Sequence, residues 1–143
     1  MNISARNVFS GTVTHITTGP VNSQVELTTA GGDKIIAVVT STSVTELGLA
    51  PGKPANAYVK APWVIVLAGP SEIRFSARNH LAGTVHTLTK GAVNSEVVVK
   101  LPGGTLVSAV ITNEAVLELA LKPDAPAAVL FKASHVILGV PIQ

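Results

Sequence analysis

The sequence has no cysteine, few charges, few aromatic residues and no long apolar run. Without cysteine, the chain can form no disulfide, no Cys-ligated metal site and no thiol nucleophile. Only 13% of the residues are charged and the formal net charge is +2, which gives no basic stripe for nucleic acid. The longest apolar stretch, Ala57 to Ala68, contains Lys60 and Pro62 and is too short to span a bilayer. Met1 to Ser10 lack the pattern of a secretion signal, so we expect a soluble cytoplasmic protein with no membrane partner.

What the sequence does contain is an internal repeat at an offset of 72 residues. Without any gap, roughly 29 of about 62 aligned positions are identical. The clearest matches are Ser-Ala-Arg-Asn at 4–7 and 76–79, Gly-Thr-Val at 11–13 and 83–85, and Val-Asn-Ser at 21–23 and 93–95. Gly-Pro and polar residues between Ala68 and Arg74 are typical of a connection. We therefore expect one module at 1–68, a linker at 69–74 and a second module at 75–143.

Each copy carries the patterns of short strands. In the first copy, residues 21–29 alternate between apolar and polar, the Gly-rich turn 30–33 follows, and 34–40 is rich in β-branched residues, which together predict a hairpin. The same plan recurs at 93–112. We expect a first strand or two at 2–18 and 74–89, and one final strand at 55–66 and 127–140.

A very short helix is predicted between the hairpin and the final strand. Ser43 to Glu46 fits a capping box, and Pro51-Gly52 ends the helix abruptly. In the second copy Ala115 replaces Ser43, which predicts that this cap is missing there. Short strands, a Gly-rich hairpin and one short helix favour an all-β fold of two tandem OB-like Greek-key barrels, each with one short helix. A generic β-sandwich is the alternative.

The polar residues shared by the two copies form a set rich in hydrogen-bond donors and without a carboxylate. They are Ser4, Arg6, Asn7, Asn22, Ser23, Thr40 and Lys60, with Ser76, Arg78, Asn79, Asn94, Ser95, Thr112 and Lys132. An oxyanion needs several N–H or O–H donors and a nearby cation to offset its charge. Each residue also has an ordinary interpretation, because Thr40 and Ser43 could only cap the helix, Asn22 and Ser23 only support a strand entry, and Lys60 only face solvent. Recurrence of the whole combination favours an anion site.

These residues resemble the Mop family of molbindins over both copies and without insertions. The resemblance rests on Ser-Ala-Arg-Asn at 4–7, Gly-x-Val at 11–13, Gly-x-Val-Asn-Ser at 19–23, Val-Thr-x-x-Ser at 39–43 before Leu-Gly-Leu, and Val-Lys-Ala-Pro at 59–62. The chain is thus similar to a tandem, or di-Mop, member. Molbindins are OB-like modules that bind molybdate, and also tungstate, inside the cell and assemble so that ligands lie between modules. The resemblance implies molybdate storage or homeostasis by a homo-oligomer, and for two modules a trimer.

The same resemblance implies the site residues. One site type would combine Ser4 and Arg6 of one module with Thr40, Ser43, Lys60 and Ala61 of a neighbour. The second copy offers Ser76, Arg78, Thr112, Lys132, Ala133 and Ser134. A second site type, near the assembly axis, is assigned to Asn22, Ser23, Asn94 and Ser95. Because Ala115 stands in place of Ser43 while Ser134 stands in place of Pro62, a hydroxyl lost at one corner is expected to be regained at another.

Three other functions are less favoured. His15, His80, His86 and His135 do not recur between the copies, and no set of nucleophile, base and orienting residue stands out, so we expect no enzyme. An OB-fold protein that binds single-stranded nucleic acid would stack bases on aromatic rings, and none of the five aromatic residues here is repeated. A regulator or transporter subunit would carry a further domain, whereas the two copies fill this sequence.

Overall fold

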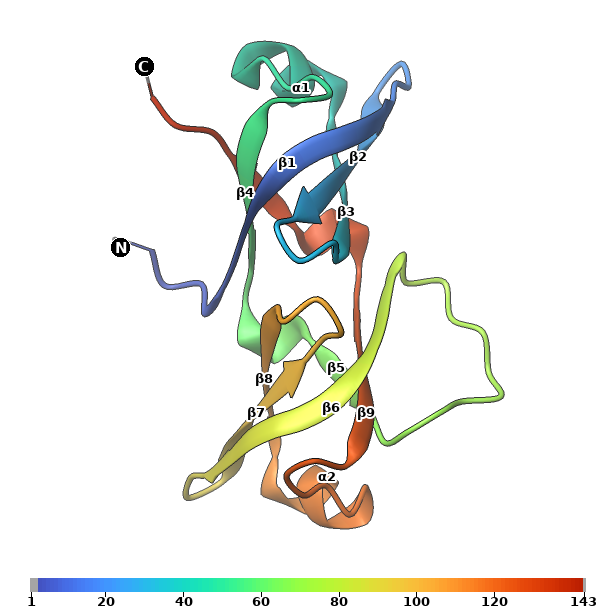
Figure 1. Ribbon diagram of the computed structural model, residues 1–143, viewed down its shortest axis with the longest axis vertical. Coiled ribbons are helices and arrows are strands. Elements are labelled where there is room, and N and C mark those ends of the chain that lie inside the picture. Colours follow the sequence, from blue (N-terminus) through green and yellow to red (C-terminus); the bar gives the residue numbers. More distant parts are fainter. Residues whose placement is uncertain (1–2, 143) are drawn as a thin grey trace.

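The computed structural model describes residues 3–142 and contains two five-stranded antiparallel sheets. The strand orders are β10-β4-β1-β2-β3 and β5-β9-β6-β7-β8. The sheets lie at opposite ends of the long axis, with α1 and α2 at the two extremes (Figure 1). The elements are β1 (Asn7–Thr17), β2 (Asn22–Thr29), β3 (Lys34–Thr40), α1 (Ser41–Leu47), β4 (Pro54–Val59), the 3₁₀ turn η1 (Ala61–Trp63), β5 (Ile65–Leu67), β6 (Asn79–Lys90), β7 (Asn94–Lys100), β8 (Leu106–Thr112), α2 (Asn113–Glu118), β9 (Pro126–Phe131), η2 (Ala133–His135) and β10 (Ile137–Gly139).

The predicted hairpins are confirmed in both copies. In β2, Ser23, Val25 and Leu27 face the core and the residues between them are half-buried, as the alternation requires. The longer first strand of each copy bends at a bulge between Val13 and His15, and its equivalent lies between Val85 and Thr87. Strong curvature of this kind lets the small sheets curl into the OB-like barrels expected from the sequence.

The repeated Gly-Thr-Val segment has a steric explanation. A Cβ atom added to Gly11 would lie 2.4 Å from the carbonyl oxygen of Thr28, and one added to Gly83 would lie 2.2 Å from that of Lys100. The first two strands of each copy therefore approach so closely at this point that only glycine fits.

The last strand of each copy differs from the prediction. Instead of one strand over 55–66, β4 ends at Val59, the turn η1 redirects the chain, and β5 pairs with β9 of the other copy. In the same way β10 pairs with β4. The two copies thus exchange their final short strands, and each barrel is completed by its neighbour (Figure 1). The division of the sequence at 69–74 stays a prediction, while in the sheets β5 lies with the second copy.

The helix start also differs from the prediction. The N-cap of α1 is Thr40 and not Ser43, because the Thr40 hydroxyl accepts a hydrogen bond from the Ser43 amide at 3.0 Å. In the second copy Thr112 accepts the Ala115 amide at 3.1 Å. The expected loss of the second cap is therefore wrong, since the repeated threonine caps both helices.

Two buried asparagines join the copies. The Asn7 amide donates to the Ser108 carbonyl at 2.8 Å and accepts from the Ser108 amide at 2.7 Å. Asn79 forms the same pair of bonds with Ile36, both at 2.8 Å. Each side chain thus continues a backbone ladder across the junction, and at 2% and 1% exposure neither asparagine faces a ligand in this chain.

A single apolar core runs through both copies. The buried cluster includes Val25 and Leu27 of the first copy and Val97 and Val99 of the second, without interruption. Phe9 and Phe131 stack across the junction with ring centroids 6.3 Å apart. Sharing a core remedies the small size of each module, because about 65–70 residues alone bury little apolar surface.

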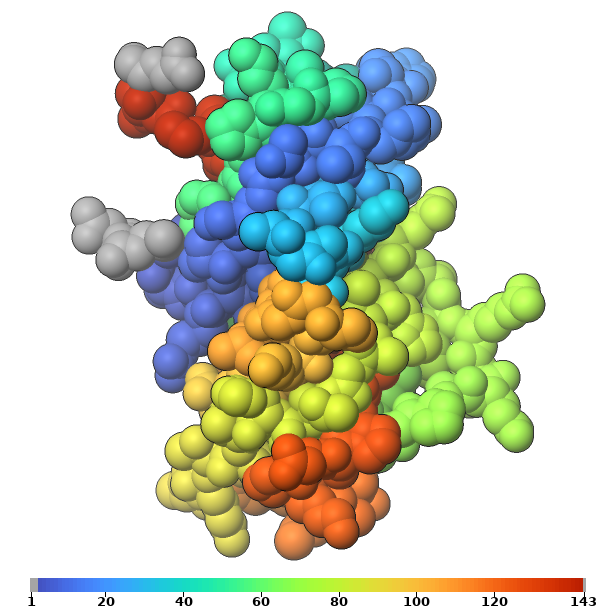
Figure 2. All heavy atoms as spheres, in the orientation of Figure 1, coloured from blue at the N-terminus to red at the C-terminus, as the bar shows by residue number. Residues whose placement is uncertain are grey.

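The loop between β5 and β6 projects from the body of the molecule, on the side opposite the two chain ends (Figure 2).

Every helix seen in residues 3–142 falls short of the length and apolar character that crossing a bilayer would require.

Replacing Asn7 with Ala is expected to lower the free energy of unfolding by about 2–4 kcal/mol, because it removes both bonds that the buried Asn7 side chain makes to the half-buried backbone of Ser108. Urea denaturation monitored by circular dichroism measures this loss. The control is Asn56→Ala, which removes one bond from Asn56 to the Tyr58 hydroxyl and is expected to cost less than about 1 kcal/mol. Equal losses in the two variants would contradict the role assigned to Asn7.

A reciprocal pair of substitutions tests the helix ends. Gly48 has a φ of 65° at the end of α1, and Ala120 holds the equivalent position after α2 with a φ of 51°. Ala120→Gly should stabilise the protein by about 0.5–1 kcal/mol, since alanine is strained in this region, and Gly48→Ala should destabilise it by a similar amount. The shift in the urea midpoint reports both effects, and shifts of the same sign would refute the argument.

Candidate functional site

A shallow pocket of about 170 Å³ gathers five of the predicted site residues. Its lining comprises Val38 with Ser76, Ala77, Arg78, Lys132, Ala133 and Ser134. Three of these residues precede β6, three begin the turn η2, and Val38 comes from β3 of the other copy. No carboxylate lines this pocket, which we call the second-copy pocket.

Strand register explains why the residues meet. Asn79 lies opposite Phe131 in the ladder of β6 and β9, so that Arg78 and Lys132 come next to each other where the two strands end. Lys132 is the N-cap of η2 but makes no capping bond with its side chain. The first hydrogen bond of the turn runs from the His135 amide to the Lys132 carbonyl at 3.0 Å. The amides of Ala133 and Ser134 come earlier in the chain and therefore take no part in the hydrogen bonds within the turn.

The first copy repeats this arrangement with altered chemistry. Asn7 lies opposite Val59, which brings Arg6 next to Lys60 and Ala61, with Ser4 upstream. We call this set the first-copy group. Pro62 holds the place of Ser134, and the Arg6 guanidinium forms an ion pair with Glu96 at 3.4 Å. The sequence analysis noted the proline but not the ion pair, because Glu96 becomes a neighbour of Arg6 only through the fold.

Thr40, Ser43 and Thr112 occupy the strand-to-helix corners. The hydroxyls of Thr40 and Ser43 lie 2.7 Å apart, and Thr40 stands two residues beyond Val38, which lines the second-copy pocket. Strand β3 packs against η2, and β8 packs against η1. Within one chain, Arg6 therefore lies with Lys60 of its own copy, and Val38 of β3 lines the pocket of the other copy.

The residues assigned to the second site type divide into buried and exposed members. Ser23 and Ser95 are each 2% exposed, and their hydroxyls bond to the Ser41 hydroxyl at 2.8 Å and to the Asn113 side chain, respectively. These bonds tie the loop before the second strand to the start of the helix. Asn22 and Asn94 are exposed, so their amides are the accessible donors of this set.

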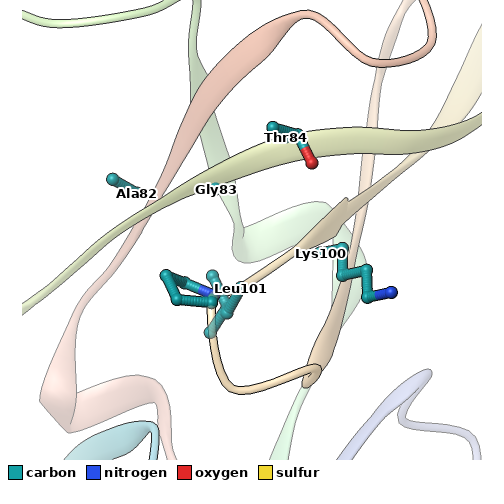
Figure 3. Close-up of a pocket in the computed structure, with 6 residues that line it drawn as sticks. Ala82, Gly83, Thr84, Lys100 and Leu101 are labelled. Carbon is teal, nitrogen blue, oxygen red and sulfur yellow. The ribbon is translucent and has the colours of Figure 1, made fainter.

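A larger hollow of about 360 Å³ on the second copy lacks such convergence. It is lined by Ala82, Gly83, Thr84, Lys100, Leu101 and Pro102. In Figure 3 the Lys100 side chain points away from Leu101 and Ala82, and the Thr84 hydroxyl is not directed to a common centre.

None of the histidines lines the second-copy pocket. His135 packs against Trp63, its counterpart in the repeat, with ring centroids 4.9 Å apart and the rings tilted by 41°, and its buried Nδ1 has no hydrogen-bond partner. Within residues 3–142, no group of three His, Asp or Glu side chains comes together in a way that could hold a metal cation.

Comparison with known proteins gives relatives over the whole chain. The TOBE domain model matches twice, at residues 3–66 and 76–138. "Molybdenum-pterin-binding protein MopA" of Rhodobacter capsulatus is 45% identical over 99% of this chain and 53% of its own length. "Molybdenum transport protein ModE" of Herbaspirillum seropedicae is 41% identical over 98% of this chain and 52% of its own length. The chain therefore spans about half the length of the curated relatives it matches.

A solved structure matches the chain from end to end. It is the cytoplasmic molybdate-binding protein ModG with molybdate bound, which is 55% identical, covers 99% of this chain and 100% of its own, and superposes with a TM-score of 0.93. This match confirms the OB-like tandem fold and the resemblance drawn from the repeated motifs. The chain belongs to the TOBE-domain family and is a tandem, di-Mop member of the molbindin type.

Proposed function

We propose that this protein binds molybdate, with tungstate as an analogue, and stores or buffers it in the cytoplasm. The observation that carries the proposal is the second-copy pocket, where Ser76, Arg78, Lys132 and Ser134 meet without a carboxylate. The ModG structure that is 55% identical has molybdate bound, and MopA is named as a molybdenum-pterin-binding protein. Both relatives support molybdate as the anion.

The chemistry of the pocket suits a tetrahedral dianion. Burying such an ion removes the water molecules that hydrate it. Cations and directed N–H and O–H donors of the protein must take the place of this water. Arg78 and Lys132 supply charge next to each other, and Ser76 and Ser134 supply hydroxyls. The apolar walls from Val38, Ala77 and Ala133 lower the local dielectric and strengthen these contacts.

The proposed contacts extend beyond one pocket. Ser4, Arg6, Lys60 and Ala61 form the corresponding group of the first copy, and Thr40, Ser43 and Thr112 contribute from the strand-to-helix corners. The second site type uses Asn22 and Asn94, with Ser23 and Ser95 positioning the segment that carries them, because both serine hydroxyls are already bonded internally.

We further propose a homotrimer. Large apolar side chains are exposed at equivalent positions in both copies, a pattern that a second copy of the chain would cover. They are Ile3 and Phe75, Val21 and Val93, and Ile65 and Ile137. Val21 and Val93 are 73% and 71% exposed and directly precede Asn22 and Asn94, which fits a second site type between protomers.

Binding without turnover is the role we propose, and storage is preferred to regulation. ModG, which is matched along its full length, is described as a cytoplasmic molybdate-binding protein, and this description favours storage. The nucleic-acid alternative gains no support from the aromatic residues, since Phe9 and Phe131 are buried and Trp63 packs against His135. Outside these positions the described residues offer no repeated aromatic platform.

The double substitution Lys60→Ala and Lys132→Ala is expected to weaken molybdate binding by about ten- to a hundredfold, because each change removes one charged donor worth about 1.5–3 kcal/mol. Equilibrium dialysis against molybdate in excess sulfate measures the affinity. The control removes two exposed lysines outside the site, Lys100→Ala and Lys122→Ala, and should bind as the unmodified protein does. Unchanged binding in the first variant would show that the charge is assigned to the wrong residues, and no binding by the unmodified protein would end the proposal.

Native mass spectrometry should give three chains per particle. Val21→Glu with Val93→Glu should shift the particle toward monomers, because association would bury two unpaired carboxylates per chain. A matched surface change, Thr18→Glu with Lys90→Glu, should leave the trimer intact. A monomeric unmodified protein would refute the assembly.

A further inference from the structure

The two copies differ at the residues that surround the proposed anion sites, and the differences accumulate on one side. We propose that each chain carries one tight and one weak site: the second-copy pocket is tight, and the first-copy group is weak. The inference rests on the proposed function and adds which residues set the affinity of each site. Two independent differences support it.

The first difference is a carboxylate next to the arginine. Arg6 forms an ion pair with Glu96 at 3.4 Å, with side-chain exposures of 66% and 29%. The repeat places Gln24 at the position of Glu96, and the described residues provide no ion pair to Arg78. An incoming dianion must therefore compete with Glu96 for Arg6 and is repelled by that carboxylate, whereas Arg78 has its donors available.

The second difference removes two donors from the 3₁₀ turn. Ser134 in η2 offers a hydroxyl and a backbone amide toward the second-copy pocket, which it lines. Pro62 replaces it in η1 and has neither group, because the proline nitrogen carries no hydrogen. The first-copy group keeps Lys60 but loses these directed contacts.

Unequal sites would give the protein two ranges of response. The tight site fills at low molybdate, and the weak site takes up anion only when the concentration rises. Glu96 sets this separation, because it is the one carboxylate that the described residues place against an arginine of either site.

Single lysine substitutions locate the tight site. In a molybdate titration of the unmodified protein by isothermal calorimetry, the second-copy pocket and the first-copy group should appear as two classes whose affinities differ at least tenfold, beside any binding at the second site type. Lys132→Ala should weaken the tight class at least tenfold, and Lys60→Ala should leave that class within twofold. Two equal classes, or loss of the tight class in Lys60→Ala, would overturn the inference while leaving the proposed function intact. Absence of any binding would instead refute the proposed function.

A substitution that restores the weak site tests the cause. Glu96→Gln with Pro62→Ser introduces the side chains of the repeat-equivalent residues, Gln24 and Ser134, and should bring the weak class within about threefold of the tight one. Glu96→Gln alone, which leaves η1 unchanged, should give part of this gain. The matched control is Glu26→Gln, which removes a carboxylate paired with Lys34 at 3.6 Å. An unchanged weak class in both Glu96 variants, or an equal gain in the control, would overturn the inference.

Discussion

The structure depends on the exchange of the final strands between its two copies. Strand β5 completes the sheet of the second copy and β10 completes that of the first, so neither barrel closes without the other. Asn7 and Asn79 extend this dependence, because each buried amide satisfies backbone groups of the opposite copy. The shared core between Phe9 and Phe131 is a consequence of the same arrangement.

The exchange also builds the candidate site. The turns η1 and η2 exist because the chain must leave one sheet to enter the other, and these turns carry Lys60, Ala61, Lys132, Ala133 and Ser134. Strand ends bring the arginines to the lysines, and the crossing of β3 onto η2 adds Val38. The polar residues are therefore gathered by the same geometry that joins the copies.

Much of the fold and of the candidate site could be predicted from the sequence. The repeat separates apolar positions, which the shared core needs in both copies, from polar positions that recur for another reason. The hairpins followed from alternation, and the set Ser76, Arg78, Lys132 and Ser134 followed from recurrence and from the family resemblance. Local patterns were weaker at the helix start, where Thr40 and Ser43 both suit a cap and only the backbone shows which one acts.

Nonlocal features could not be predicted. The exchange of strands does not change the alternation of apolar and polar residues along the sequence, since β5 and β10 have the composition of ordinary edge strands. The role of Asn7 was hidden because an amide that pairs with backbone across a junction has the same residue type as one that binds an anion. The contact of Arg6 with Glu96 joins residues 90 positions apart, and no periodicity reports such a pair.

The tandem connection has a consequence for how such a protein could arise and assemble. A lone copy would present β4 without the strand that flanks it, and two separate copies would have to meet before either closed. Covalent linkage turns that encounter into an event within one molecule, at an effective concentration that a short tether keeps in the millimolar range. Duplication in tandem thus removes the dilution limit on forming the paired barrels and frees each copy to diverge, since its partner is always the same neighbour.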